Sequence, residues 1–301
     1  MPRILSALLA LAWLAWLGGE ALGAEGDKLR YLTSIYLDAK GGGMRQPEGL
    51  ACNDTSLVVA DTGKGRLLRY TLEDREVKPA GELVAPQLAA PLRVQTTSQG
   101  EVFVLDGKAR RIVRFGAKGE PLGYLTPEGV PGPTSLVPRS FKIDRNDAIY
   151  LLDVFSARVL VLGADGTYQR HVPFPGAYGF FSDLAVDGRG TIYLLDSLRA
   201  TLWAAAKDAR EFSARGNPLR AHASFPTSIA VDRRGVLWVT DENGSGVVLV
   251  AQDGSVLGRQ LAMGWTEGLL DTPGQLCLND KGLVFIADRA NNRVQVFAIV
   301  R

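Results

Sequence analysis

Short runs of apolar and β-branched residues alternate with polar turns along most of this chain, and the alternation has a long period. At the C-terminal end, two such runs (284–287 and 294–297) flank a polar turn that opens with Asp. Runs of this kind bounded by turn residues predict β-strands. The same Asp recurs at intervals of 45, 47, 43, 45 and 47 residues, at Asp61, Asp106, Asp153, Asp196, Asp241 and Asp288. Six copies at a period in the forties predict a repeat architecture.

Each repeat has the same internal order of signals. A Pro opens a first run that ends in Asp or Asn, a short polar turn follows, and a second run ends at the recurring Asp. In the fifth repeat these parts are Pro226–Asp232, Arg233–Gly235 and Val236–Asp241. The fourth repeat is looser, because Phe181 stands where the others have Pro. Several short strands at this spacing favour a β-propeller.

This order of signals resembles the NHL repeat, whose pattern is a Pro, an apolar-Ala-apolar-Asp strand, Gly, Ile-Tyr-Val-Ala-Asp and Asn-Arg-Ile-Gln-Val-Phe. The resemblance covers about residues 44–301 and is strong in repeats one, three, five and six. It implies an all-β fold, a six-bladed β-propeller whose blades each have four antiparallel strands. We place the repeats near 44–85, 88–128, 136–175, 178–215, 224–262 and 271–301.

The last repeat stops at Arg301, directly after its third predicted strand. A ring with an open edge would leave a row of unpaired backbone groups. Residues 29–37 form a strand candidate ahead of the first repeat. We therefore expect this N-terminal strand to complete the last blade and join the two ends of the chain.

The N-terminal segment is typical of a secretory signal peptide. Arg3 precedes an apolar run of 14 residues, and Ala21 and Gly23 are small residues at the positions that determine cleavage. The alternative is an uncleaved anchor, for which 14 apolar residues are short. We expect residues 1–23 to be removed and residues 24–301 to form the propeller. The protein is then periplasmic or extracellular, without stable membrane insertion after cleavage.

The charge of the chain is nearly balanced, at a formal net +2 with 34 Lys and Arg against 32 Asp and Glu. No global field recruits nucleic acid, so we expect no nucleic-acid partner.

The two cysteines occupy related positions on the first strands of blades one and six, which become neighbours when the ring closes. Cys52 lies five residues after Pro47, and Cys277 lies four residues after Pro273. Successive strand residues point to opposite faces, so both thiols point either into the shared interface or away from it. An oxidising compartment permits a disulfide in the first case. A disulfide and two buried thiols both remain open.

The recurring Asp is best explained as a structural turn residue, because every blade has it. Positions that differ between repeats are more informative. If the first strands start at the channel mouth, the residues after each repeat-opening Pro or Phe surround the axis and offer hydrogen bonds to a polar ligand. The alternative is a water-filled channel that neutralises its own charge. These six residues are Glu48, Arg93, Arg139, Asp183, Ser228 and Gln275.

The longest predicted loops connect each fourth strand to the next blade's first strand, so they gather on one face of the ring. Loops on a rigid scaffold often carry binding sites. These loops are expected at 126–138, 171–181, 207–225 and 263–273. Their aromatic residues either form a binding surface or fill gaps between blades: Tyr124, Phe174, Tyr178, Phe180, Phe181 and Trp265. Among them, Tyr178, Phe180 and Trp265 are the candidates for partner contact.

Known enzymes with similar propellers indicate which residues an active site of this kind would need. The peptide-amidating lyase has a zinc site of His residues on inner strands, whereas this chain has only His171 and His222, both expected in loops. Calcium-dependent lactonases and arylesterases need converging oxygens, for which Glu48, Asp183, Asn53 and Asn279 are candidates by type.

The sequence thus favours an exported module that binds a protein, peptide or polysaccharide at the long-loop face. No cofactor or metal is predicted for it. The alternative is a metal-dependent hydrolase or lyase, with Ca²⁺ as a possible ion, acting at the channel mouth through Glu48 and Asp183 with Arg93 or Arg139.

Overall fold

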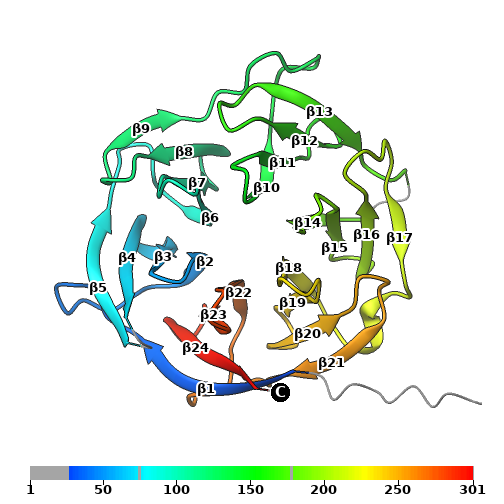
Figure 1. The fold of residues 1–301 in the computed structure, drawn as a ribbon. Helices are drawn as coiled ribbons and strands as arrows, with labels where there is room; N and C mark the ends of the chain where they lie inside the picture. The colour runs from blue at the N-terminus through cyan, green and yellow to red at the C-terminus, as the bar shows by residue number, and fades with distance from the viewer. Residues whose placement is uncertain (1–26, 74–75, 177–178, 301) are drawn as a thin grey trace, which may run out of the picture.

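The computed structural model describes residues 27–73, 76–176 and 179–300. It confirms an all-β propeller: six four-stranded antiparallel sheets surround a central channel (Figure 1). No helix of this described part is long and apolar enough to cross a membrane. The expected signal peptide at 1–23 lies outside the described residues.

The strands of the first three blades follow the chain from the channel outward. Blade one contains β2 (Pro47–Cys52), β3 (Ser56–Asp61), β4 (Arg66–Glu73) and β5 (Glu76–Leu83), with the 3₁₀ helix η1 (Thr62–Lys64). Blade two contains β6 (Pro91–Thr96), β7 (Val102–Asp106), β8 (Arg111–Phe115) and β9 (Pro121–Tyr124). Blade three contains β10 (Pro138–Ile143), β11 (Ile149–Asp153), β12 (Arg158–Leu162) and β13 (Tyr168–Pro173).

The other three blades have the same order, except that the last takes its outer strand from the N-terminus. Blade four contains β14 (Phe181–Val186), β15 (Ile192–Asp196), β16 (Thr201–Ala205) and β17 (Ser213–Arg215), followed by η2 (Leu219–Ala221). Blade five contains β18 (Pro226–Val231), β19 (Leu237–Asp241), β20 (Gly246–Val250) and β21 (Val256–Gln260). Blade six contains β22 (Pro273–Leu278), β23 (Leu283–Asp288), β24 (Arg293–Val300) and β1 (Lys28–Ile35).

The hydrophobic core lies between the blades. Every residue of β11 is buried, because each face of a blade packs against a neighbouring blade. One core cluster joins Phe103 of blade two to Phe141 and Leu151 of blade three. Strands buried on both faces have near-continuous apolar sequences, whereas the outer strand β13 alternates between exposed residues and residues that are at least half-buried.

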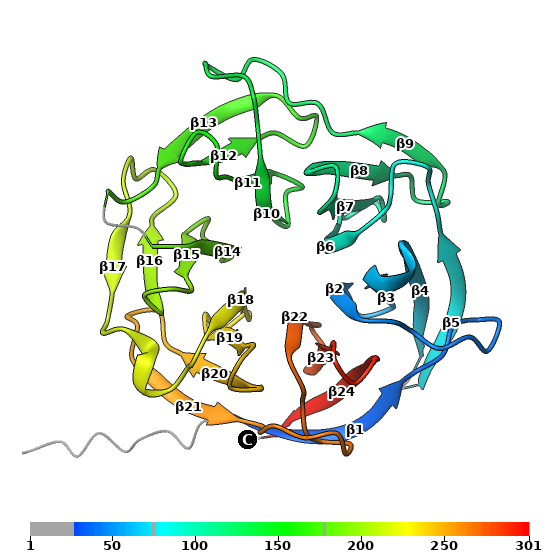
Figure 2. The ribbon, with the colours of Figure 1, turned by 180° about the vertical axis from the view of Figure 1, so that it is seen from behind.

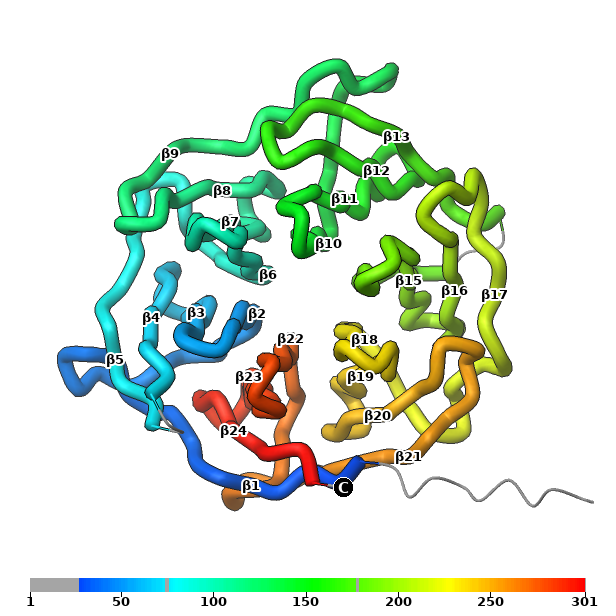
Figure 3. Tube along the Cα trace, viewed as in Figure 1, coloured from blue at the N-terminus to red at the C-terminus, as the bar shows by residue number. Residues whose placement is uncertain are grey.

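The N-terminal strand closes the ring, as the sequence predicted. β1 pairs antiparallel with β24, with Leu29 opposite Ile299 and Ile35 opposite Val294. Figure 3 shows the first and last described segments side by side at the rim. The last blade is therefore complete, and its backbone edge is paired.

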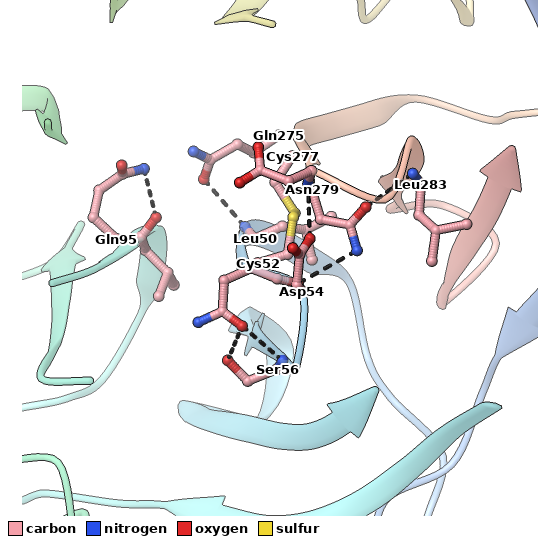
Figure 4. Close-up of a disulfide and its surroundings, with 12 residues drawn as sticks. Leu50, Cys52, Asp54, Ser56, Gln95, Gln275, Cys277, Asn279 and Leu283 are labelled. Atoms are coloured by element: carbon pink, nitrogen blue, oxygen red, sulfur yellow. Dashed lines mark hydrogen bonds between the residues drawn. A yellow bond between two sulfur atoms is a disulfide. The ribbon is translucent and has the colours of Figure 1, made fainter. Parts of the chain in front are cut away.

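A disulfide closes the ring a second time, nearer the channel. Cys52 of β2 and Cys277 of β22 are bonded, with their Cα atoms 6.0 Å apart (Figure 4). Beside the bond, the backbone N–H of Asp280 donates to the Asp54 carboxylate at 2.8 Å. Of the two arrangements that the sequence left open, the structure has the bonded one.

The recurring Asp ends the second strand of each blade and fixes the chain segment that enters the blade. The Asp106 carboxylate accepts hydrogen bonds from the backbone N–H groups of Ala89 and Ala90 at 2.7 and 2.6 Å. Burial acts to raise the pKa of Asp106, but these bonds and one from Ala109 lower it below its ordinary value. In blade five, where Gly246 replaces the usual Arg, Arg259 of the outer strand donates to Asp241.

Some segments expected as loops contain strand. Residues His171–Pro173 belong to β13, and β17 lies inside the segment 207–225. Tyr124 is the last residue of β9, and Phe181 is the first of β14. The outer strands were hard to locate because their exposed faces place weak demands on residue type.

We expect the double variant Cys52→Ser/Cys277→Ser to lose about 2–4 kcal/mol of unfolding free energy, because the disulfide constrains the unfolded chain. The bond spans 225 residues of sequence, so it restricts most of the chain. Thermal unfolding with and without reductant measures the loss. Reductant should lower the wild-type melting temperature to that of the variant and leave the variant unchanged. A wild-type melting temperature that is insensitive to reductant contradicts the expectation.

Candidate functional site

The channel has two different ends. At one end, called here the long-loop face, the inner strands begin, and the segments from the rim cross to them (Figure 2). At the other end, called here the turn face, the inner strands turn back into the second strands. Six inner strands line the channel: β2, β6, β10, β14, β18 and β22.

Each inner strand has a register irregularity just after its first residue. In β10 the pairing shifts between Pro138 and Ser140, and in β14 between Phe181 and Asp183. Because a bulge re-aims the side chains around it, Arg139 is not the counterpart of Asp183 in blade three. That position is held by Ser140, which pairs with Leu152 as Asp183 pairs with Leu195.

Three of the sequence candidates lie on the long-loop side, where each charged side chain already contacts another group of the protein. Glu48 accepts from Arg93 at 3.2 Å and from Arg289 at 3.0 Å. Arg289 also contacts Glu242 at 2.5 Å, so the chain of ion pairs crosses four blades. Arg139 instead stacks on the Phe180 ring, 4.1 Å from its centroid, and donates to a backbone carbonyl. Acidic and basic groups therefore neutralise one another over part of this mouth.

Asp183 is a fully buried carboxylate whose hydrogen-bonding capacity is used by the protein. It accepts from the hydroxyls of Ser140 and Ser228 at 2.5 and 2.9 Å. The backbone N–H groups of Leu184 and Ile229 donate to it at 2.9 Å each. These bonds connect blades three, four and five, which is a structural role. Gln275 does the same between blades six and one, accepting from the Leu50 N–H at 3.1 Å (Figure 4).

The oxygens considered as Ca²⁺ ligands do not fit a metal site. Glu48 and Asp183 make the contacts within the protein that are described above, and the side chains of Asn53 and Asn279 hold turns in place. Asn53 accepts from the backbone of Ser56 at 2.8 Å, and Asn279 accepts from that of Leu283 at 2.9 Å. Within residues 27–73, 76–176 and 179–300, no group of three or more His, Cys, Asp or Glu is placed to hold a metal ion.

The remaining candidates are separate from one another. His171 lies in the outer strand β13 rather than in a loop, bonded to the Tyr168 hydroxyl at 2.8 Å, and His222 follows η2. Trp265 is 82% exposed in the segment that leads to β22. Tyr178 lies outside the described residues.

A cavity of about 820 Å³ opens at the turn face, where the sequence predicted no site. All six blades line it, mostly with the ends of inner strands and the turns that follow them. The turn carboxylates and amides along its rim are occupied by local backbone groups. For example, Asp187 accepts from the N–H groups of Arg189 and Thr191. The volume is within the range of small-molecule sites.

Lys142 of β10 lines this cavity and has a different status from the rim residues. Its side chain is 11% exposed, and its Nζ lies 3.8 Å from an Asp183 oxygen. At this distance the two groups form an ion pair, but they are too far apart for a hydrogen bond. Burial lowers the pKa of Lys142, and the charge of Arg93 lowers it further, whereas Asp183 opposes the shift. The signal in the sequence was a Lys between two apolar residues, Phe141 and Ile143, of an inner strand.

Comparisons with known proteins agree with the fold. Residues 270–297 match the family model of the NHL repeat. No curated protein matches the chain by sequence. The matched stretch covers most of blade six, so one blade of this six-bladed β-propeller matches the NHL repeat.

Solved structures with the same fold include several enzymes. A gluconolactonase from Xanthomonas campestris has a TM-score of 0.65 at 18% identity, over 91% of this chain and 94% of that one. Virginiamycin B lyase from Staphylococcus aureus has a TM-score of 0.61 at 14% identity, over 91% and 100%. The PQQ-bound aldose sugar dehydrogenase from Streptomyces coelicolor has a TM-score of 0.62 at 15% identity, over 92% and 99%. At these identities the likeness shows the fold alone.

We expect Lys142→Met to raise the free energy of unfolding near pH 7 by about 1 kcal/mol, since a lowering of the folded-state pKa by one unit corresponds to about 1.4 kcal/mol. Asp183 keeps four other hydrogen-bond donors in the variant, so its carboxylate is not left unpaired. The folded-state pKa is lowered, so the unfolded chain binds the proton more readily and the lysine destabilises the fold below its ordinary pKa. The gain should therefore shrink as the pH approaches about 10, where the lysine loses its proton in both states.

Thermal unfolding across this pH range measures the difference between the variant and the wild type. Lys207→Met is the control, because Lys207 is exposed at the cavity rim. A gain that is equal for both variants, or that does not change with pH, contradicts the assignment of a buried charge to Lys142.

Proposed function

We propose that this NHL-repeat propeller is an exported binding module that holds a protein or peptide partner on its long-loop face. The observation that carries the proposal is the placement of exposed apolar side chains. Among the described residues, all the exposed large hydrophobic side chains except Leu122 and Leu257 belong to segments at this face. They are Tyr36, Leu37, Val84, Phe155, Phe180, Leu198, Met263 and Trp265.

A concentration of this kind is unusual on a protein without partners, since exposed apolar residues are normally scattered. Leu122 and Leu257 lie on the outer strands β9 and β21, so none of the group is at the turn face. The asymmetry between the two faces supports an interface at the long loops. Aromatic residues, Met and Arg are also the residue types enriched in protein interfaces.

The densest part of this surface lies where blades three and four meet. Phe155 and Leu198 are each 59% exposed in the turns between second and third strands. Phe180 lies between these blades and carries the Arg139 guanidinium on its ring. The backbone carbonyl of Phe180 accepts from the Ser197 N–H at 2.9 Å, which ties the segment before Leu198 to Phe180. An aromatic ring, a stacked Arg and aliphatic neighbours make a suitable centre for protein recognition.

The charge at this centre favours an acidic partner segment. Burial lowers the pKa of Arg139, and the positive charge of Arg110 lowers it further. Two like charges near one another gain from a carboxylate that approaches both. A protein or peptide fits better than a polysaccharide, because half of the exposed group is aliphatic and sugars stack chiefly on aromatic rings.

Export fits this function and is supported by the disulfide. Cys52 and Cys277 are bonded, and such bonds persist in oxidising compartments. We propose that the apolar N-terminal segment of the sequence is the signal that directs the protein to the periplasm or the extracellular space.

We expect the double variant Phe155→Ser/Leu198→Ser to weaken partner binding about 30-fold or more, because the loss of a hot spot at the centre of an interface costs about 2 kcal/mol or more. The tagged wild type recovers candidate partners from a periplasmic extract, and the affinity of each purified candidate is then measured for both proteins. Leu122→Ser/Leu257→Ser is the matched control, since these leucines are exposed on outer strands. Equal affinities for the two double variants refute the proposed interface, and binding only to polysaccharide favours a glycan-binding module.

A further inference from the structure

The turn-face cavity has a floor just beyond Lys142, on the side of the long-loop face. Ser140, Asp183 and Ser228 lie at that level of the inner strands, and each is almost completely buried. Both serines donate to Asp183, so hydrogen bonds join blades three, four and five there. None of these three residues lines the cavity, which therefore ends at this level and opens at the turn face.

Lys142 occupies a level of the channel that is otherwise free of charge. It pairs with Tyr150, three residues before the recurring Asp of its blade. Three of the other five residues at this level are Ala, so little side-chain volume surrounds the amine. All six line the cavity, and the five are Ala51, Gln95, Ala185, Ala230 and Cys277.

The amine of Lys142 has hydrogen-bonding capacity that the protein does not use. Its Nζ lies 3.8 Å from an Asp183 oxygen and makes no hydrogen bond within the described part of the chain. Asp183 already accepts from four other donors of the protein. The Nζ is not one of the side-chain atoms that lack both a partner and accessible surface, so it keeps contact with the cavity.

A second unused donor lies across the channel from Lys142. Gln275 of β22 accepts from the Leu50 N–H through its Oε1, whereas its Nε2 makes no hydrogen bond among the described residues. Figure 4 shows this nitrogen on the side of the amide away from Leu50. Both unused groups near the floor are donors, and the carboxylate behind them is already hydrogen-bonded. Such a lining matches a ligand group that only accepts hydrogen bonds.

Between this floor and the rim, part of the cavity wall is apolar. Half-buried side chains of four blades line it there, and their remaining surface can cover the hydrocarbon part of a ligand. These side chains are Ile143, Val186, Ala230, Val231 and Leu278.

The rim does not favour a second acidic group on the same ligand. Five Asp residues line the cavity, against four Arg or Lys residues besides Lys142. Arg189 already pairs with Asp187, and Arg233 pairs with Asp280. The positive charge that is left for an anion is therefore the one near the floor.

We propose that the turn-face cavity binds a small monocarboxylate with an apolar chain. The carboxylate accepts a charge-assisted hydrogen bond from Lys142, and the chain lies along the apolar part of the wall. Burial lowers the pKa of Lys142, and a bound carboxylate opposes this effect because a nearby negative charge favours the charged amine.

The test is isothermal titration calorimetry near pH 7 on the full-length protein after any signal cleavage, with butyrate, hexanoate and octanoate as probes. We expect saturable binding at one site, with an affinity that rises about threefold to fourfold for each added methylene. Lys142→Met should weaken hexanoate binding at least about tenfold, because a hydrogen bond to a charged group is lost. It should leave the affinity for 1-hexanol, which has the same chain without the charge, unchanged.

Control variants separate the two parts of the site. Lys207→Met removes an exposed rim charge and should bind hexanoate like the wild type. Ala230→Leu fills part of the apolar wall two blades away from Lys142, so it should weaken octanoate binding more than butyrate binding.

Three outcomes overturn the proposal. The first is the absence of saturable carboxylate binding, and the second is an equal hexanoate affinity of the wild type and Lys142→Met. The third is tighter binding of adipate than of hexanoate, because it would place a second acidic group at the rim.

This site is independent of the proposed interface on the opposite face. The Phe155→Ser/Leu198→Ser variant should bind hexanoate as tightly as the wild type. Lys142→Met should bind the protein partner normally. Melting temperatures of the variants establish that each is folded under the conditions of the test.

Discussion

The structure depends on every blade having a neighbour on both faces. The second strands are buried throughout, and their apolar side chains reach clusters shared between adjacent blades. A row of such sheets has two unprotected ends unless it closes into a ring. The pairing of β1 with β24 and the bond between Cys52 and Cys277 both act at the point of closure. The pairing completes blade six with a strand whose chain continues into blade one, and the disulfide bonds the inner strands of these two blades.

The same requirement explains why most polar residues near the channel are structural. Each blade needs an Asp to anchor its incoming segment and an Asx or Thr residue to fix the turn at the other face. For example, the side-chain oxygens of Asp144, Asp232 and Thr97 each accept a hydrogen bond from the backbone N–H of the residue four positions later. These oxygens are occupied before any ligand arrives. Side chains that the scaffold does not use in this way are therefore the more informative ones about function.

Much of the fold followed from the sequence because it repeats: the period gave six blades, and the missing strand of the last repeat gave the closure by β1. The candidate site did not follow in the same way. Counting residues from each Pro treated Glu48 and Arg139 as equivalents of Asp183, but the irregularity after the first residue of each inner strand changes the register. Contacts such as those of Asp183 with blades three and five depend on three segments that are far apart in sequence. Lys142 was missed because the lowering of its pKa comes from burial, which the sequence of its strand does not reveal.

The two faces of the propeller differ in how freely their connecting segments can vary in length and sequence, so they suit different roles. The turns at one face are tied to the backbone by their Asx residues, so the cavity between them has a fixed rim. The crossing segments at the other face vary in length, and together with the turns between second and third strands they carry most of the exposed apolar residues. Enzymes and this chain share the architecture at low identity, so the scaffold itself decides nothing about chemistry. What distinguishes this chain lies in its own side chains: the exposed apolar residues of the long-loop face, and at the turn-face cavity a lysine, Lys142, whose pKa burial lowers.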